Sequence, residues 1–299
     1  PYEAGRRAIL EALRDAGREN ELPQLILITG SPGVEEEVLR GIDSVTGGKI
    51  PVMGGSSADD EIKGEWRQFV NDRVYSRGVS VVAVFTDLKI ALGYEAGYER
   101  VERAGVVTRA AGRVIYEIEN QPAAEVYNAW TGGIISQKLQ TGGTVLRETT
   151  FWPLAKRRSS NGKEYLISIH PLSVDASDHS LSVFANVESG ETLQLMYGSW
   201  QILLNRCYST PAKALQEFSL SPGDGVFALY TYCAGTMLAI PEEHRVKMPL
   251  LLRASLGNIP FIGTFTFGEQ GYLEGVGNVH GNLVNSIVVF TEVEQPFSR

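Results

Sequence analysis

The chain has 299 residues, of which 43% are hydrophobic and 21% charged, a composition typical of folded rather than disordered proteins. Its 27 Lys and Arg against 35 Asp and Glu give a net charge of −8. A nucleic-acid partner is therefore not expected, because phosphate backbones bind concentrated positive charge. The longest apolar runs have the length of strands, so no membrane span or membrane partner is expected either.

The chain contains two cysteines, Cys207 and Cys233, and neither belongs to a CxxC motif. Two are too few for a disulfide framework or a cysteine zinc site. This thiol usage and the acidic composition favour a reducing cytoplasm. Pro1 has no Met before it, so we expect the chain to continue upstream and draw little from the absence of a targeting segment.

The first part of the chain reads as helices packed on a sheet. Apolar residues recur at helical spacing from residue 3 and stop at Gly17, and a continuous apolar run at 25–28 is typical of a strand covered on both faces. The run Glu35-Glu36-Glu37 lies where a helix dipole favours acidic side chains. The predicted segments are helices at 3–17 and 34–45 and strands at 25–28, 50–53, 66–70, 78–85 and 88–94.

The remaining residues predict a connecting segment followed by a second domain. Residues 131–163 are rich in Gly, Thr, Ser and basic side chains, which favours an inter-domain connection. We therefore expect domains at 1–130 and 164–299. The other predicted elements are strands at 114–118, 166–170, 179–187 and 191–197, a helix from 121 to 130, and a helix over 199–218 interrupted at Pro211.

An internal repeat indicates two related halves. Ile50-Pro51-Val52-Met53-Gly54 returns as Ile259-Pro260-Phe261-Ile262-Gly263. A strand and helix precede each copy, and a buried strand ending in Val-Phe-Thr follows each. We expect an α+β fold of two pseudo-repeated halves, with mixed sheets packed with helices and a crevice between or beside their strand ends.

Candidate ligand-binding residues lie at and after the end of the repeated strand segment, 50–54 in the first half and 259–263 in the second. Glycines there let backbone amides approach a ligand, and hydroxyls and carboxylates orient it. The alternative is that Gly54 and Gly55 only form a tight turn, with Ser56 as a helix cap. The candidates are Gly54, Gly55, Ser56, Ser57 and Asp59 in the first half, and Thr264, Thr266, Gly268, Glu269, His280 and Asn282 in the second.

Cys233 is a further candidate, because it stands where a predicted strand leads into a helix. A thiol at a helix N-terminus can become a nucleophile, although most free cysteines are buried structural residues. Nucleotide-binding, kinase and metalloprotease motifs are absent. No two histidines have metal-ligand spacing, so no metal site is expected, but a single histidine such as His280 can hold haem.

The closing segment resembles a known family. Residues 259–269, followed by His280-Gly281-Asn282, resemble the C-terminal part of FIST domains, and 232–235 resemble the segment before their acidic helix, here Glu242-Glu243. Residues 50–60 and 106–127 are similar to the N-terminal FIST pattern. The sequence departs from the family at Thr236, where an arginine is common, so an anionic-ligand contact is not carried over there. It also lacks the leading strand expected before residue 3.

The resemblance implies a sensory role. FIST domains are regarded as sensory modules of bacterial, archaeal and some eukaryotic signalling proteins, proposed to bind small ligands such as amino acids. Some members bind haem and report nitric oxide to histidine kinases or cyclic-di-GMP enzymes. We therefore expect a non-enzymatic sensor without a cofactor, which signals through such a partner protein, a further segment or a homodimer interface.

Two alternatives stay open beside this small-ligand sensor. One is a haem-binding nitric oxide sensor, which would need one of the histidines as an axial ligand. The other is a cysteine-dependent hydrolase or transferase that uses Cys233 as its nucleophile.

Overall fold

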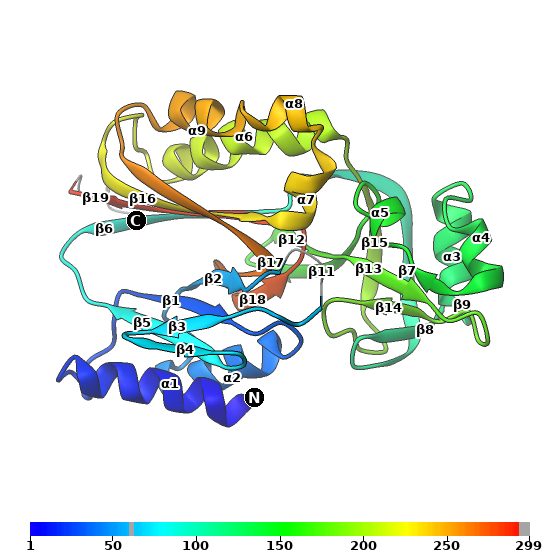
Figure 1. The fold of residues 1–299 in the computed structure, drawn as a ribbon, viewed down its shortest axis with the longest axis horizontal. Coiled ribbons are helices and arrows are strands. Elements are labelled where there is room, and N and C mark those ends of the chain that lie inside the picture. Colours follow the sequence, from blue (N-terminus) through cyan, green and yellow to red (C-terminus); the bar gives the residue numbers. More distant parts are fainter. Residues whose placement is uncertain (60–62, 293–299) are drawn as a thin grey trace.

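The structure is a computed structural model that describes residues 1–59 and 63–292. Its strands form an eight-stranded sheet, a nine-stranded sheet and a small hairpin of β3 (Gln68–Val70) and β4 (Arg73–Tyr75), and helices cover parts of both large sheets (Figure 1). The predicted α+β class, with mixed sheets packed with helices, is confirmed. In the described part of the chain, no helix combines the length and hydropathy that crossing a bilayer requires.

The eight-stranded sheet contains the two repeats. Its strands are β1 (Leu25–Gly30), β2 (Val52–Ser56), β5 (Val79–Val84), β6 (Lys89–Glu95), β16 (Gly225–Cys233), β17 (Phe261–Leu273), β18 (Gly277–Gly281) and β19 (Asn285–Thr291). In the first repeat, β1 pairs in parallel with β2 and antiparallel with β5. In the second, β16 pairs in parallel with β17 and antiparallel with β19. The two predicted halves therefore have the same strand arrangement.

The antiparallel pair β2–β17 joins the repeats into one sheet. The strand order is β5-β1-β2-β17-β16-β19-β6, with β18 pairing β17 at the side. Strand β17 is long enough to serve both repeats: Phe261 to Thr266 pair with β16, and Phe267 to Gln270 pair with β2. The repeats are thus connected through the strands that carry the predicted ligand-binding residues.

The inner faces of the two repeats pack on each other, and helices cover their outer faces. The covering helices are α1 (Tyr2–Asp15) and α2 (Glu35–Thr46) on the first repeat, and α6 (Trp200–Glu217), α7 (Ala234–Ala239), α8 (Glu242–Arg245) and α9 (Met248–Leu256) on the second. Leu25, Met53 and Val288 form the buried contact between the inner faces. Figure 1 shows the four layers in sequence from α1 and α2 at the bottom to α6 and α9 at the top.

Close helix packing completes the first repeat. Ile9 of α1 and Ile42 of α2 are buried against Ile26 of β1. Where the helices cross, a Cβ added to Gly5 would lie 2.2 Å from the Val38 carbonyl oxygen, and one added to Gly41 would lie 2.0 Å from that of Tyr2. Only glycine permits this approach of the two backbones.

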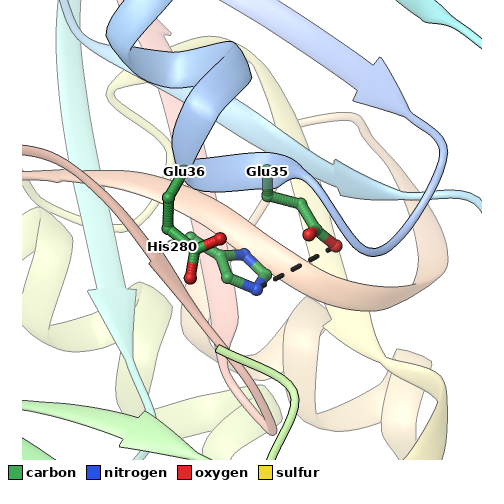
Figure 2. Close-up of side chains that lie close together, drawn as sticks. All are labelled: Glu35, Glu36 and His280. Carbon is green, nitrogen blue, oxygen red and sulfur yellow. Dashed lines mark ion pairs between the residues drawn. The ribbon is translucent and has the colours of Figure 1, made fainter. Parts of the chain in front are cut away.

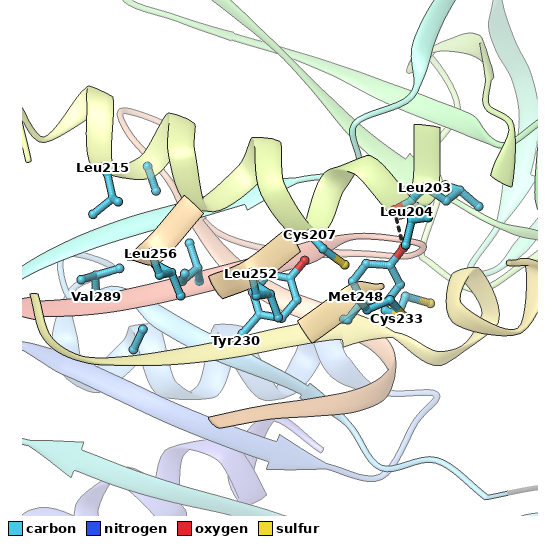
Figure 3. Close-up of a cluster of buried hydrophobic side chains, with 14 of the residues drawn as sticks. Leu203, Leu204, Cys207, Leu215, Tyr230, Cys233, Met248, Leu252, Leu256 and Val289 are labelled. Atoms are coloured by element: carbon cyan, nitrogen blue, oxygen red, sulfur yellow. Dashed lines mark hydrogen bonds between the residues drawn. The ribbon is translucent and has the colours of Figure 1, made fainter. Parts of the chain in front are cut away.

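The second repeat has its own apolar core, in which α6 and α9 cover β16 and β19 (Figure 3). Tyr230 and Val289 supply its sheet side, and Leu252 and Leu256 of α9 are among the residues packed on them. The predicted interruption at Pro211 is wrong, because α6 runs unbroken through it. Pro211 is itself buried, so packing outweighs the backbone hydrogen bond that proline cannot donate.

The nine-stranded sheet has the order β10-β13-β14-β8-β7-β15-β11-β12, with β9 on β8. Its elements are β7 (Glu99–Ala111), β8 (Val114–Ile118), β9 (Gln121–Pro122), α3 (Ala123–Trp130), α4 (Ser136–Thr141), β10 (Gly143–Thr144), α5 (Leu146–Thr149), β11 (Leu154–Ser160), β12 (Lys163–Ile169), β13 (Pro171–Val174), β14 (Leu181–Val183) and β15 (Thr192–Tyr197). Tyr127 of α3 is buried in the core of this unit with Ile118 and Leu193.

The predicted connecting segment, 131–163, contributes α4, β10, α5 and β11 to this second unit. Strand β11 pairs with both β12 and β15, so part of the segment is sheet. Both large sheets combine strands that come before residue 130 with strands that come after residue 164. The division of the chain into domains at 1–130 and 164–299 stays a prediction.

Candidate functional site

A pocket of about 320 Å³ lies between the two repeats. Strands β1, β2 and β5 form its wall in the first repeat, and β16, β17 and β19 form the opposite wall. Val82 and Ile262 line it and are 58% and 57% exposed, so the pocket opens to solvent. Phe69, from hairpin strand β3, is at its rim and is also exposed. We call this pocket the inter-repeat cleft.

The repeats contribute equivalent residues to the inter-repeat cleft. In the first repeat, Thr29 is the register partner of both Gly55 and Ser80. In the second, Thr231 is the register partner of both Thr264 and Ser286. All six residues line the cleft. Each wall therefore presents hydroxyl groups at matching positions, and the sequence repeat is reproduced in the lining.

Gly54 and Gly55 allow the close strand packing of the first wall. Gly54 has φ +155°, and a Cβ there would lie 1.9 Å from the Ile28 carbonyl oxygen of β1. A Cβ on Gly55 would lie 2.4 Å from the side chain of Thr266 on β17. Both glycines are residues of strand β2 and pair with β17, so the alternative of a tight turn is wrong.

Thr266 and Glu269 form a polar pair at the inner end of the cleft. Thr266 lines the cleft, and its Oγ1 donates a hydrogen bond of 2.9 Å to Oε1 of Glu269. The other carboxyl oxygen, Oε2, accepts a 3.0 Å bond from the backbone N–H of Val284. The side chain of Glu269 is fully buried, and burial raises the pKa of its carboxyl group. Glu269 therefore responds to changes at Thr266 without lining the cleft itself.

Cys233 is next to this pair and is buried. It is the register partner of Thr266, whose hydroxyl donates to the Glu269 carboxyl group. Burial, and then the neighbouring Glu269, raise the pKa of the Cys233 thiol. A reactive cysteine needs a lowered pKa and access to solvent. Cys233 is buried and its thiol has a raised pKa, so the geometry offers no support for the nucleophile alternative.

Arg206 places a buried positive charge behind the same region. Its guanidinium lies over the rings of Tyr98 and Tyr232, at 5.4 and 5.2 Å from their centroids. Nη1 donates to the backbone carbonyls of Ala96 and Leu283. This charge lowers the pKa of Glu269, against the larger effect of burial. A long amphipathic helix of mixed composition carries Arg206, and nothing in its pattern distinguishes it from an exposed arginine.

A second polar group lies near the β2–β17 junction, where Glu35 and Glu36 at the start of α2 face His280 of β18 (Figure 2). Arg113 links it to the nine-stranded sheet. Arg113, between β7 and β8, donates from Nη2 to Glu35 at 2.6 Å and to Glu36 at 2.7 Å. Ser56 at the end of β2 donates to the other oxygen of Glu35 at 2.8 Å, which excludes the alternative of a helix cap at this serine. His280 of β18 approaches that oxygen to 4.0 Å. We call Glu35, Glu36, Arg113 and His280 the junction cluster.

The junction cluster is a buried ion-pair network. Burial raises the pKa of the Glu36 carboxyl group, but the charges of His280 and Arg113 outweigh it and lower the pKa to about 2. The pKa of Glu35 is lowered by the same charges against burial. Glu35, Glu36 and His280 offer oxygen and nitrogen atoms within 4.8 Å of one another, a spacing that could hold a metal ion. The Arg113 guanidinium, however, already pairs with both carboxylates where a cation would bind.

The predicted site residues therefore fall into several places. Ser57 donates to Gln68 of the hairpin, and Asp59 accepts backbone N–H groups in the following loop. A Cβ on Gly268, which has φ +69°, would lie 2.7 Å from His280, and Asn282 accepts from the backbone of His170. Four predicted residues line the cleft: Gly54, Gly55, Thr264 and Thr266. Cys233 and Glu269 lie behind this lining. His280 is a member of the junction cluster, and Ser56 contacts it through Glu35.

Haem ligation does not fit the inter-repeat cleft. None of the described residues that line it is a histidine. Both ring nitrogens of His280 have partners, the Phe184 carbonyl and the Gln270 side chain. Burial lowers the pKa of His170 to about 4, and that ring contacts the Leu146 carbonyl oxygen. We derive no role for haem from these histidines.

Comparison with known proteins identifies the family. A family model for the FIST N domain matches residues 2–121, and one for the FIST C domain matches residues 123–272. A 78-residue stretch is 35% identical to part of an uncharacterized protein of Methanocaldococcus jannaschii, and covers 26% of this chain and 15% of that relative. The chain thus matches only a small part of the relative's length.

FIST domains are sensory domains of signal transduction proteins. The two family matches cover nearly the whole chain, in the order N domain and then C domain, in agreement with the resemblance found in the sequence. The protein therefore belongs to the FIST family.

Proposed function

We propose that this protein is a non-enzymatic sensory domain that binds a small metabolite, such as an amino acid or a related molecule, in the inter-repeat cleft. The observation that carries the proposal is the solvent-open cleft between the repeats, lined by hydroxyl groups at equivalent positions of both walls. Concave sites of this size, mostly apolar with a few polar groups, are the usual binding places of small molecules.

Ligand binding can be converted into a change of arrangement because the two walls belong to different repeats. A ligand that contacts both Thr29 and Thr231 favours the arrangement of the repeats in which both contacts are made. The size of the shift in population is set by the difference in the ligand's affinity for the two arrangements. Ser56 follows the cleft residue Gly55 on β2 and donates a hydrogen bond to Glu35, and Glu35 pairs with Arg113 in the turn between β7 and β8. This chain of contacts is the proposed route from the ligand to the second unit.

The proposed output is contact with a signalling partner in the cytoplasm. By analogy with other family members, that partner is a protein such as a histidine kinase or a cyclic-di-GMP enzyme, or a second copy of this chain. Both cysteines are free and buried, which suits a reducing compartment.

The test is a thermal-shift screen of amino acids and other small metabolites, followed by calorimetry with the compounds that raise the melting temperature. Thr266→Val removes a hydroxyl from the cleft while it keeps the side-chain shape, so it should weaken binding about tenfold. Thr141→Val, at the exposed end of α4, is the matched control and should bind like the parent. Equal binding by parent and Thr266→Val would place the ligand elsewhere.

A further inference from the structure

The inter-repeat cleft offers hydroxyl groups and apolar surface but no formal charge. Among the residues that the structure describes, none of the side chains lining it carries a charge: they are aliphatic, aromatic or hydroxyl-bearing, apart from the thioether of Met53. Its aliphatic hydroxyl side chains are Thr29, Ser80, Thr231, Thr264, Thr266 and Ser286, and the phenol of Tyr230, a further lining residue, accepts a hydrogen bond from Asn285. The neighbouring carboxyl group, on Glu269, is held behind Thr266 with both oxygens already hydrogen-bonded. The lining therefore contains no group that would neutralise a charged ligand.

This lining discriminates between classes of ligand. A carboxylate or ammonium group that leaves water loses its hydration, and the loss is recovered only by an opposite charge or several strong hydrogen bonds. A hydroxyl side chain both donates and accepts, so it matches the hydroxyl and amide groups of an uncharged molecule. The ends of a free amino acid are charged and find no counter-charge in the described lining.

The repeat adds a second constraint. Thr29 and Ser80 form a hydroxyl pair on the first wall, and Thr231 and Ser286 form the equivalent pair on the second. Equivalent aliphatic pairs accompany them: Leu27 with Val82, and Leu229 with Val288. The cleft thus contains two half-sites of the same chemistry, each flanked along its strands by apolar side chains.

We infer that the ligand is an uncharged small molecule with a hydroxyl or amide group at each end and an apolar middle, bound across both half-sites. This inference rests on the proposed function and narrows its ligand class, because it excludes free amino acids and keeps uncharged related molecules. One end hydrogen-bonds to the wall of Thr29 and Ser80, and the other to the wall of Thr231 and Ser286. The affinity of a ligand of this kind depends directly on the distance between the two repeats, because the ligand must contact both.

The probes for a test are four molecules with one shared ring. 1,4-Cyclohexanedimethanol has an uncharged hydroxyl at each end, and cyclohexylmethanol has only one. Cyclohexane-1,4-dicarboxylate and 1,4-bis(aminomethyl)cyclohexane carry two negative or two positive charges. The chain has four methionines, and Met53 lines the cleft, so the methyl signal of Met53 in NMR spectra of methionine-labelled protein reports occupancy. The signal is assigned with Met53→Leu.

The diol should shift the Met53 signal saturably, with the mono-alcohol at least fivefold weaker and both charged probes without effect. Thr29→Val and Thr231→Val should each weaken diol binding several-fold, while Thr141→Val leaves it unchanged. Equal or tighter binding of a charged probe at Met53 would overturn the ligand class but leave the cleft as the binding site. If none of the four probes shifts Met53 but a compound from the thermal-shift screen does, the ligand class is wrong and the cleft remains the binding site. If that compound binds without shifting Met53, the cleft is wrong as well.

Discussion

Gly55 lies directly opposite Glu269 where β2 pairs antiparallel with β17. This pairing joins the two repeats, and the same short stretch carries Thr266, whose side chain lines the inter-repeat cleft. The contact that holds the repeats together and the proposed ligand site therefore share residues. A ligand that displaces Thr266 acts on the junction itself.

We expect Gly55→Ala to destabilise the protein by about 1–3 kcal/mol, the usual cost of an overpacked core. The added Cβ would lie 2.4 Å from Thr266, and both strands are fixed by their ladders. The measurement is the free energy of unfolding in urea. Gly30→Ala in neighbouring β1 is the control, since its Cβ would meet nothing closer than 3.7 Å. Equal stability of the two variants would mean that β2 and β17 separate easily.

We expect Arg113→Met to destabilise by about 3–5 kcal/mol, because it removes the guanidinium that pairs with two largely buried carboxylates. Glu35 is 6% exposed and Glu36 is 19% exposed, so solvent replaces the lost charge poorly. Arg109→Met breaks the exposed pair with Glu117 and should cost about 1 kcal/mol or less.

The same variant can be rescued if the lost ion pair is the cause. Adding Glu35→Gln and Glu36→Gln to Arg113→Met removes the two negative charges that have lost the guanidinium and should restore part of the stability. If the triple variant is less stable than Arg113→Met alone, packing of the arginine stem rather than its charge accounts for the loss.

The sequence predicted the architecture better than the site. The repeat of 50–54 in 259–263 indicated two equivalent halves, because local strand and helix patterns determine each half. The β2–β17 pairing could not be read from it, since strand neighbours distant in the chain leave no local signal. Aligning the repeats could have identified Thr29 and Thr231 together, although each alone resembles any threonine in a buried strand.

The junction cluster shows why charged site residues were missed. Arg113 sits in a tight turn between β7 and β8, a position that normally faces solvent, and its partners are 77 and 78 residues away in the chain. Sequence spacing does not encode such a contact. Glu35 and Glu36 were explained by the helix dipole alone, which is correct for their place at the start of α2 but incomplete.

The thiol of Cys233 should resist alkylation in the folded protein. Burial raises its pKa, so at pH 7.5 almost none is thiolate and reagents lack access. Iodoacetamide labelling followed by mass spectrometry should find Cys233 and Cys207 modified only when the protein is unfolded in urea. Labelling of native Cys233 within minutes would support the hydrolase or transferase alternative.

Acidification should destabilise the protein through His170. Burial lowers its pKa to about 4, whereas an unfolded histidine has a value of about 6.5. Between these values the unfolded chain binds a proton that the folded protein does not. The stability contributed by neutral His170 is thus fully present above pH 6.5 and is lost as the pH falls towards 4.

His170 alone should contribute a loss of about 3 kcal/mol over this window, since each pKa unit corresponds to about 1.4 kcal/mol. The raised pKa of the Glu269 carboxyl group acts in the opposite direction, because the folded protein then holds a proton that the unfolded chain has released, so the His170 contribution is the difference between the parent and His170→Gln. Urea unfolding at half-unit pH steps measures it. His170→Gln keeps a polar side chain near the Leu146 carbonyl oxygen but cannot titrate, so it should lose less stability than the parent between pH 6.5 and 4. His179→Gln, at a partly exposed histidine paired with Glu125, is the control and should retain the slope of the parent. A parent slope unchanged by His170→Gln would assign the acid sensitivity to other groups, with the junction carboxylates next to be tested.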